Sequence, residues 1–225
     1  SGAHRVEKDL PGPPRVPRGA LYGVATARAM SNYQITGVRL HHFPELIYGL
    51  AYVKKAAAIA NARLGLLPRE IADAIARACD ALTSSTEHHA HFAVDVIQGG
   101  AGTSTNMCAN EVIANLAGIE LGSAVGSYDK VHPNDHVNLC QSTNCAYPSA
   151  AKLAVVLKHG EVIASLERLI ASLDAKGEAF ESVIKMGRTQ LQDAVPMTLG
   201  QESRRFAATL RADLKFARRN VDALY

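Results

Sequence analysis

Tryptophan is absent from the 225-residue chain, and aromatic residues make up only 5% of it. Hydrophobic residues still account for 48%, with alanine and leucine abundant, so the composition favours helices packed on helices over a β-sandwich. The net charge is only +3 and both signs are interspersed, which gives no reason to expect a nucleic-acid partner. No apolar run approaches the roughly 20 residues of a membrane-spanning helix, so no membrane partner is expected.

Signals for export and for disulfide or metal chemistry are also lacking. The segment Ser1–Leu10 is polar and charged, unlike a secretory signal. The histidine-rich stretch Glu87–His91 does not have the ligand spacing of a zinc site, and no fourth ligand is evident. No Cys-x-x-Cys pair occurs among the four cysteines, which are Cys79, Cys108, Cys140 and Cys145. We therefore expect a cytoplasmic protein with reduced thiols and no metal site.

Apolar residues at helical spacing predict helices over most of the chain. The expected helices are residues 43–64, a helix from Pro68, residues 107–120, a long helix from near Pro148, and a last helix through Ala207 to Leu224. The last two carry apolar stripes typical of a helix bundle. The final stripe is still in phase at Tyr225, so we expect a longer protein to continue this helix. The proline-rich residues 1–20 are expected to be irregular, and residues 188–196 to form a loop.

Three polar segments between helices are the candidate sites for chemistry. The first, Gly99–Asn106, is rich in glycine and hydroxyl groups and leads into a helix. Glycine lets backbone N–H groups approach a ligand, and a helix start attracts negative charge, so the segment favours a carboxylate or phosphate. It lacks the lysine of a phosphate-binding loop, and a simple helix cap is the structural alternative.

The other two segments each have a structural alternative as well. Gln141–Asn144 offers three small hydrogen-bonding side chains at a helix start, more than one cap requires. Upstream of it, His132–His136 also fits a turn stabilised by its own side chains. The third segment, Gly187–Pro196, also fits a structural turn before a bundle helix.

Together, these segments resemble the three motifs of the aspartase/fumarase superfamily, in the same order. The first reads GGAGTSTNM at Gly99–Met107, the second reads HPNDHVN at His132–Asn138 with STN at Ser142–Asn144, and the third reads KMGRTQLQDAVPMTLGQE at Lys185–Glu202. The stretches Val6–Leu10 and Leu21–Ala29 also resemble the family's N-terminal segment. The resemblance covers nearly the whole chain.

The resemblance implies a mainly α fold with little β. A small N-terminal domain, residues 1–140, would precede the first part of a central helical-bundle domain, residues 141–225. The family forms homotetramers whose active sites gather loops from three subunits. It uses no organic cofactor, and a divalent cation such as Mg²⁺ activates some members.

The expected reaction is the reversible deamination of L-aspartate to fumarate and ammonia. Gly100–Ser104 and Gln190, where fumarases typically carry histidine, favour this reaction over that of a class II fumarase. A third hypothesis is a non-catalytic helical assembly module that retains the fold. The small-molecule partner would be a dicarboxylate in the first two cases.

The resemblance also assigns roles to residues. Removal of a proton next to a carboxylate builds up negative charge, which neutral hydrogen-bond donors stabilise. The expected substrate-binding residues are Thr103, Ser142, Thr143, Asn144, Thr189 and Gln190. Of these, Thr189 and Gln190 are also expected to be catalytic. A secondary anion site is expected at His132, Asn134 and Asp135.

The sequence departs from the family pattern in several places. Cys108 stands where the family usually has Asn, Cys145 where it nearly always has Asp, and Ser203 where Phe is usual. A nucleophilic role for Cys145 is not expected, since no base is identifiable beside it. The family's general base, a serine on a mobile loop, does not occur in these residues, so we expect the chain alone to be inactive.

Overall fold

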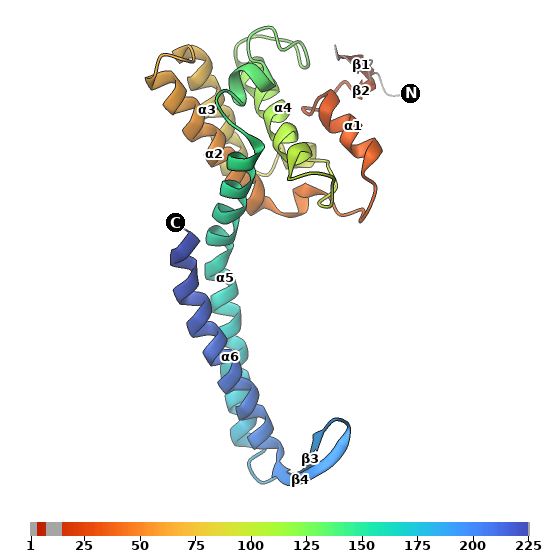
Figure 1. Ribbon diagram of the computed structural model, residues 1–225, viewed down its shortest axis with the longest axis vertical. Coiled ribbons are helices and arrows are strands. Elements are labelled where there is room, and N and C mark those ends of the chain that lie inside the picture. The colour runs from red at the N-terminus through yellow and green to blue at the C-terminus, as the bar shows by residue number, and fades with distance from the viewer. Residues whose placement is uncertain (1–3, 8–14, 225) are drawn as a thin grey trace. The chain divides into compact units, whose positions relative to one another are not determined.

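The computed structural model describes residues 4–7 and 15–224. The chain divides into two compact units, one ending at Ala154 and the other beginning at Val155 (Figure 1). The predicted domain boundary after residue 140 falls just before the long helix and stays a prediction. None of the described helices is both long and apolar enough to cross a membrane.

The first unit is built mainly from helices. Its elements are β1 (His4–Val6), β2 (Arg15–Pro17), α1 (Val24–Asn32), α2 (Pro44–Arg63), α3 (Arg69–Ser84) and α4 (Thr103–Glu120). Short helical turns occur at Leu40–His42, His89–His91 and Pro133–Val137. The second unit contains most of α5 (Thr143–Ala179), which begins in the first, followed by β3 (Ile184–Thr189), β4 (Gln192–Thr198), α6 (Leu199–Val221) and the turn Asp222–Leu224. The predicted mainly α fold is confirmed.

The core of the first unit lies between α2, α3 and α4. Its largest side chains are almost completely removed from solvent, among them Ile47, Leu50, Ile75, Leu82 and Ile113. Their spacing of three and four places them on the inner faces of the helices, as the apolar pattern predicts. The helices expected at 43–64 and from Pro68 are confirmed as α2 and α3.

A buried carboxylate fastens α1 to this core. Glu111 on α4 is 2% exposed and accepts hydrogen bonds from the backbone N–H groups of Gly23, Ala25 and Thr26 at 2.8, 2.8 and 3.1 Å. The Thr26 hydroxyl donates a further bond at 2.6 Å. These donors are the free N–H groups at the start of α1, which a negative charge stabilises.

Two helices begin earlier than expected. α4 starts at Thr103, not near Met107, and α5 starts at Thr143, with Pro148 inside the helix. Both early starts fall on runs of hydroxyl and amide residues, which serve well in a first helical turn because they cap free backbone groups. The spacing of apolar residues cannot predict a first helical turn that consists of polar residues.

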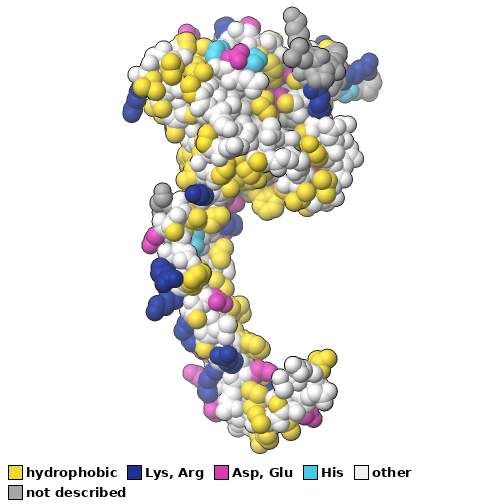
Figure 2. Space-filling model, in the orientation of Figure 1, with side chains coloured by type: hydrophobic (Ala, Val, Ile, Leu, Met, Phe, Trp, Pro, Cys, Tyr) yellow, Lys and Arg dark blue, Asp and Glu magenta, His cyan; other side chains and the backbone are white. Residues whose placement is uncertain are grey.

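The second unit is held together by the stripe that α5 and α6 share. Ile163 and Ile170 on α5 are buried with Ala207 and Leu214 on α6, and four further apolar residues pack against them. Ion pairs Arg211–Asp174 and Arg218–Glu167 join the same two helices. Basic and acidic side chains are interspersed along this helix pair (Figure 2). The predicted bundle stripe is confirmed for these residues.

Two expectations about irregular segments are wrong. Within residues 1–20, His4–Val6 pairs antiparallel with Arg15–Pro17, and a two-stranded ribbon tolerates proline because each strand has an unpaired edge. Pro11, Pro13 and Pro14 lie outside the described residues. The loop expected at 188–196 is a hairpin in which β3 pairs with β4 around a turn at Gln190 and Leu191.

Candidate active site

Two helix starts meet in the first unit. A side-chain Cβ at Gly102, the N-cap residue of α4, would lie 2.5 Å from the ring of Tyr147 in the first turns of α5. The Nδ2 of Asn106 lies 3.4 Å from the Thr143 Oγ1. The positive ends of both helices are therefore next to each other, and negative charge is favoured there.

Glycine at position 102 allows the starts of α4 and α5 to approach this closely. Its φ of +84° suits glycine, and the missing side chain leaves room for Tyr147. Gly102 thus sets the distance between the helices as well as the start of α4.

Hydroxyl groups line the outer side of this junction. Thr103 and Ser142 are exposed and Thr143 is half-buried. The Ser142 Oγ accepts from the Asn144 backbone N–H at 3.2 Å, so Ser142 caps α5. Because Asn106 donates to the Thr143 oxygen, the Thr143 hydroxyl hydrogen is free to donate to a ligand.

A buried brace holds the first turn of α4. The Gln98 Oε1 accepts from the Thr105 N–H at 2.8 Å, and its Nε2 donates to the Thr105 Oγ1 at 2.9 Å and to the Asp95 carbonyl at 3.0 Å. The Asp95 carboxylate in turn accepts from Thr36, Gly37 and Ile97 at 2.8–2.9 Å. Burial opposes its ionisation, but these hydrogen bonds outweigh burial and lower the pKa of Asp95 to about 2.

Beneath the hydroxyl groups lies a cluster of amides around a lysine. The Asn138 Oδ1 accepts from the Lys54 Nζ at 2.8 Å, from the Asn106 Nδ2 at 3.1 Å and from the Asn110 Nδ2 at 3.2 Å. Lys54 is completely buried, and this burial lowers its pKa to about 7, against the opposing effect of nearby Cys145 and Cys79. No carboxylate among the described residues forms an ion pair with Lys54.

Sequence reasoning missed this cluster. Lys54 is adjacent to Lys55 in the predicted helix, and nothing in the sequence indicates that one is buried and the other is not. Lys55 is partly exposed and pairs with Asp80 at 2.5 Å. Asn106 and Asn138 were inside recognised motifs, which was the available signal, but neither had an assigned role.

The predicted secondary anion site is one local turn. The His132 Nδ1 accepts from the backbone N–H groups of Asn134 and Asp135 at 3.3 and 3.2 Å. This arrangement leaves the hydrogen on Nε2, which can donate outward. The structure thus brings His132, Asn134 and Asp135 together, in the geometry of a capped turn.

Thr189 and Gln190 belong to the second unit. Thr189 ends β3 and Gln190 begins the hairpin turn, and both are exposed. Gln190 and the following Leu191 have φ of +47° and +64°, although neither is glycine. Such strained positions concentrate at functional sites.

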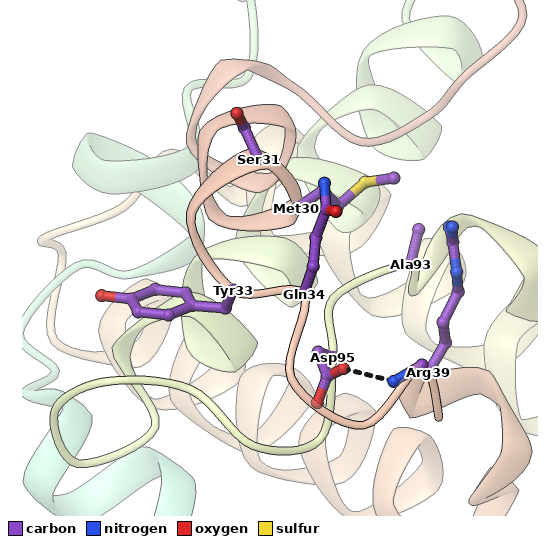
Figure 3. A pocket seen from close by; sticks show the side chains of 8 residues that line it. Met30, Ser31, Tyr33, Gln34, Arg39, Ala93 and Asp95 are labelled. Atoms are coloured by element: carbon purple, nitrogen blue, oxygen red, sulfur yellow. Dashed lines mark hydrogen bonds between the residues drawn. The ribbon is translucent and has the colours of Figure 1, made fainter.

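One hollow in the first unit's surface lies away from these residues. About 530 Å³ in volume, it is lined by Met30, Ser31, Tyr33, Gln34, Gly37, Arg39, Ala93 and Asp95 (Figure 3). None of the predicted site residues lines it. Since Asp95 is already satisfied by its hydrogen bonds, the hollow offers no free carboxylate to a ligand.

No group of three or more His, Cys, Asp or Glu residues in the described part of the chain is arranged to hold a metal ion. In the histidine-rich stretch, the buried His89 forms a hydrogen bond between its Nε2 and the Leu82 carbonyl at 2.9 Å. His88 and His91 stack with ring centres 6.4 Å apart.

A family model described as Lyase matches residues 12–224, and the chain belongs to this lyase family. The aspartate ammonia-lyase of Pseudomonas aeruginosa is 54% identical over 215 residues, covering 96% of this chain and 45% of the relative. The aspartate ammonia-lyase of Escherichia coli is 46% identical and covers 98% of this chain and 46% of the relative. The chain thus spans about half the length of these relatives.

Solved structures agree with the fold. The native crystal structure of a fumarate lyase:delta crystallin from Brucella melitensis has 50% identity and a TM-score of 0.87, covering 99% of this chain and 51% of that one. A class II fumarase from Schistosoma mansoni has 35% identity and a TM-score of 0.81, covering 99% of this chain and 46% of that one.

Proposed function

We propose that the chain is the N-terminal portion of an aspartate ammonia-lyase, which reversibly deaminates L-aspartate to fumarate and ammonia. The observation that carries the proposal is the junction of α4 and α5, where two helix starts present hydroxyl donors side by side. A carboxylate group of the substrate fits such a junction. Identities of 46–54% to aspartate ammonia-lyases support the choice of reaction.

The chemistry explains why the donors are neutral. Loss of the proton beside a carboxylate moves negative charge onto that carboxylate, and donors already in place stabilise it without reorganising. Thr103, Ser142, Thr143 and Asn144 bind the substrate from the first unit. By the resemblance, Thr189 and Gln190 on the hairpin also bind substrate and act in catalysis, in active sites that gather loops from three subunits. His132, Asn134 and Asp135 form a secondary anion site.

The complete enzyme is proposed to be a cytoplasmic homotetramer without an organic cofactor, with Mg²⁺ as a candidate activator. Residues 1–140 form its small first domain and residues 141–225 the start of its bundle. Apolar side chains left exposed on α5 and α6 support further helix packing. They are Val155, Leu157, Val162, Leu169, Phe206 and Phe216.

Two other functions are separable by assay. A class II fumarase would convert L-malate. The Schistosoma mansoni fumarase is 35% identical to this chain, less than the aspartate ammonia-lyases, so this function is less supported. A non-catalytic assembly module would act on neither compound. The Cys145 departure and the lack of the family's serine loop in these residues favour the module.

The test is the ultraviolet absorbance of fumarate formed from L-aspartate or from L-malate. It compares this chain with a version extended through the downstream coding sequence, because the family's serine base does not occur in these residues. We expect the extended protein to act on L-aspartate and the 225-residue chain to be inactive. Activity on L-malate alone would support a fumarase, and inactivity of both proteins on both compounds would contradict a lyase function.

A further inference from the structure

The hydroxyl group of Thr143, a proposed substrate-binding residue, is oriented by a neighbouring amide. The Asn106 Nδ2 donates to the Thr143 oxygen at 3.4 Å, and no described residue accepts a hydrogen bond from the Thr143 hydroxyl. A hydroxyl whose oxygen faces a donor directs its own hydrogen away from that donor. The direction of the Thr143 hydrogen therefore depends on which end of the Asn106 amide faces it.

The Asn138 amide determines which end of Asn106 that is. The orientation of Asn138 is fixed at both of its ends, since its Oδ1 accepts from the Lys54 Nζ at 2.8 Å and its Nδ2 donates to the Gln141 carbonyl at 3.0 Å. Because a carbonyl oxygen only accepts, the Nδ2 must face Gln141 and the Oδ1 must face Lys54. The bond to Gln141 retains this orientation when Lys54 is neutral.

Two buried amides on α4 direct their nitrogens at the Asn138 oxygen. The Nδ2 atoms of Asn106 and Asn110 lie 3.1 and 3.2 Å from the Asn138 Oδ1. Both side chains leave their own Oδ1 atoms without a partner among the described residues. Reversal of either amide would place its oxygen against the Asn138 oxygen, and neither atom could donate to the other. The unpartnered oxygens are thus a consequence of the orientation that Asn138 imposes.

Of these two amides, only Asn106 forms a hydrogen bond with a proposed substrate-binding residue. We propose that Asn106 is a positioning residue that directs the Thr143 hydroxyl hydrogen toward a carboxylate of the substrate. This inference rests on the proposed function, which places that carboxylate at Thr143. A donor already directed at the carboxylate stabilises the developing charge without first having to rotate. The distance of 3.4 Å is long for a hydrogen bond, and such bonds commonly shorten when a substrate binds.

Asn110 provides a matched control. Like Asn106, it is buried on α4 and donates to the Asn138 Oδ1, but its other bond is to the Met107 sulfur and not to Thr143. Asn106→Leu and Asn110→Leu each remove one donor to Asn138 with little change in side-chain volume. In the extended protein, Asn106→Leu should lower kcat/KM for L-aspartate on the order of tenfold, mainly through kcat. Asn110→Leu should lower it by less than about twofold.

A double-mutant comparison separates orientation of the hydroxyl from a general loosening of the fold. Thr143→Val removes the hydroxyl group and keeps the shape of the side chain. In that background, Asn106→Leu should cost less than about a further twofold, because no hydroxyl remains to be oriented. A purely structural role would give the same loss in both backgrounds. If Asn106→Leu does not fold, Asn106→Asp replaces it, since a carboxylate has the same shape but cannot donate to Thr143.

Three results would overturn the proposal. They are full activity of Asn106→Leu, equal losses for Asn106→Leu and Asn110→Leu, and an Asn106→Leu loss that is undiminished in Thr143→Val.

Succinate, a dicarboxylate with no amino group to eliminate, tests the orientation independently of the reaction. Calorimetry should show that Asn106→Leu weakens succinate binding about fivefold, the value of one neutral hydrogen bond, and that Asn110→Leu does not. Equal effects of the two changes would again overturn the proposal. If the extended protein binds succinate but does not convert L-aspartate, the proposed reaction fails and the succinate comparison decides the role of Asn106. If it does not bind succinate, the binding role of Thr143 fails and this proposal with it.

Discussion

The two units present their proposed site residues in opposite ways. In the first, Thr103 and Thr143 stand on a junction braced from below by Gln98, Asn106 and buried Lys54. In the second, Thr189 and Gln190 lie on an exposed hairpin, and apolar side chains gather on it (Figure 2). Leu191 at its tip is 95% exposed. The first unit therefore organises its own donors, whereas the hairpin has the features of an element whose stabilising contacts come from outside this chain.

The largest effect is expected where the junction is tightest, at Gly102. Gly102→Ala combines a left-handed φ with a Cβ placed 2.5 Å from the Tyr147 ring, so the free energy of unfolding of the first unit should fall by roughly 2–4 kcal/mol. Urea denaturation followed by circular dichroism measures the loss. Hydrogen exchange should quicken at Thr103–Asn106.

Gly100→Ala is the matched control. Gly100 has a similar φ of +79°, but the nearest atom to an added Cβ is 3.8 Å away. This variant should lose only about 1 kcal/mol. Equal losses for the two variants would show that packing against Tyr147 does not set the junction.

An intermediate effect is expected from buried Lys54. Its pKa in the folded chain is about 7, against 10.5 when exposed, so the unfolded state binds more protons between these values. The free energy of unfolding contributed by Lys54 should therefore rise with pH across this window, by roughly 1–3 kcal/mol. Below pH 7 both states are protonated and this contribution levels off.

The measurement compares unfolding of the original chain and of Lys54→Met as a function of pH. The free energy of unfolding of the original chain should rise relative to that of Lys54→Met as pH increases from 7 to 10.5, because the cost of burying the charge disappears. Lys55→Met should show no such trend, since Lys55 is partly exposed and paired with Asp80. A trend common to both variants would contradict a special state of Lys54.

The contrast between these lysines shows where sequence reasoning stops. Helical periodicity located α2, α3 and the α5–α6 stripe, since apolar spacing reports directly on which face is buried. The motifs indicated Thr103 and Ser142–Asn144, which lie at the starts of α4 and α5, and their roles stay predictions. Periodicity could not single out Lys54, because burial of its amine depends on Asn138, far away along the chain.

The predictions that were wrong have local causes. The loop predicted at residues 188–196 is part of the hairpin at 184–198, whose turn has neither Asn nor Gly at its two left-handed positions, where such turns usually have them. The pairing of β1 with β2 was hidden by the surrounding prolines. Polar first turns made α4 and α5 start earlier than the apolar pattern indicates.

The smallest effect, and the sharpest test of the contrast between the units, is expected at the hairpin tip. Leu191→Gly relieves a φ of +64° and removes a side chain that is 95% exposed, so it should stabilise the hairpin of this chain by about 1 kcal/mol. Slower hydrogen exchange in β3 and β4 measures the gain. Leu191→Ser keeps the strained backbone and should show no such gain, which separates the effect of strain from the effect of exposed apolar surface.

In the extended protein, the same Leu191→Gly change should instead weaken assembly or activity if another subunit covers the tip. A gain of similar size in both proteins would mean that Leu191 has no partner, and the hairpin would then be as self-sufficient as the first unit.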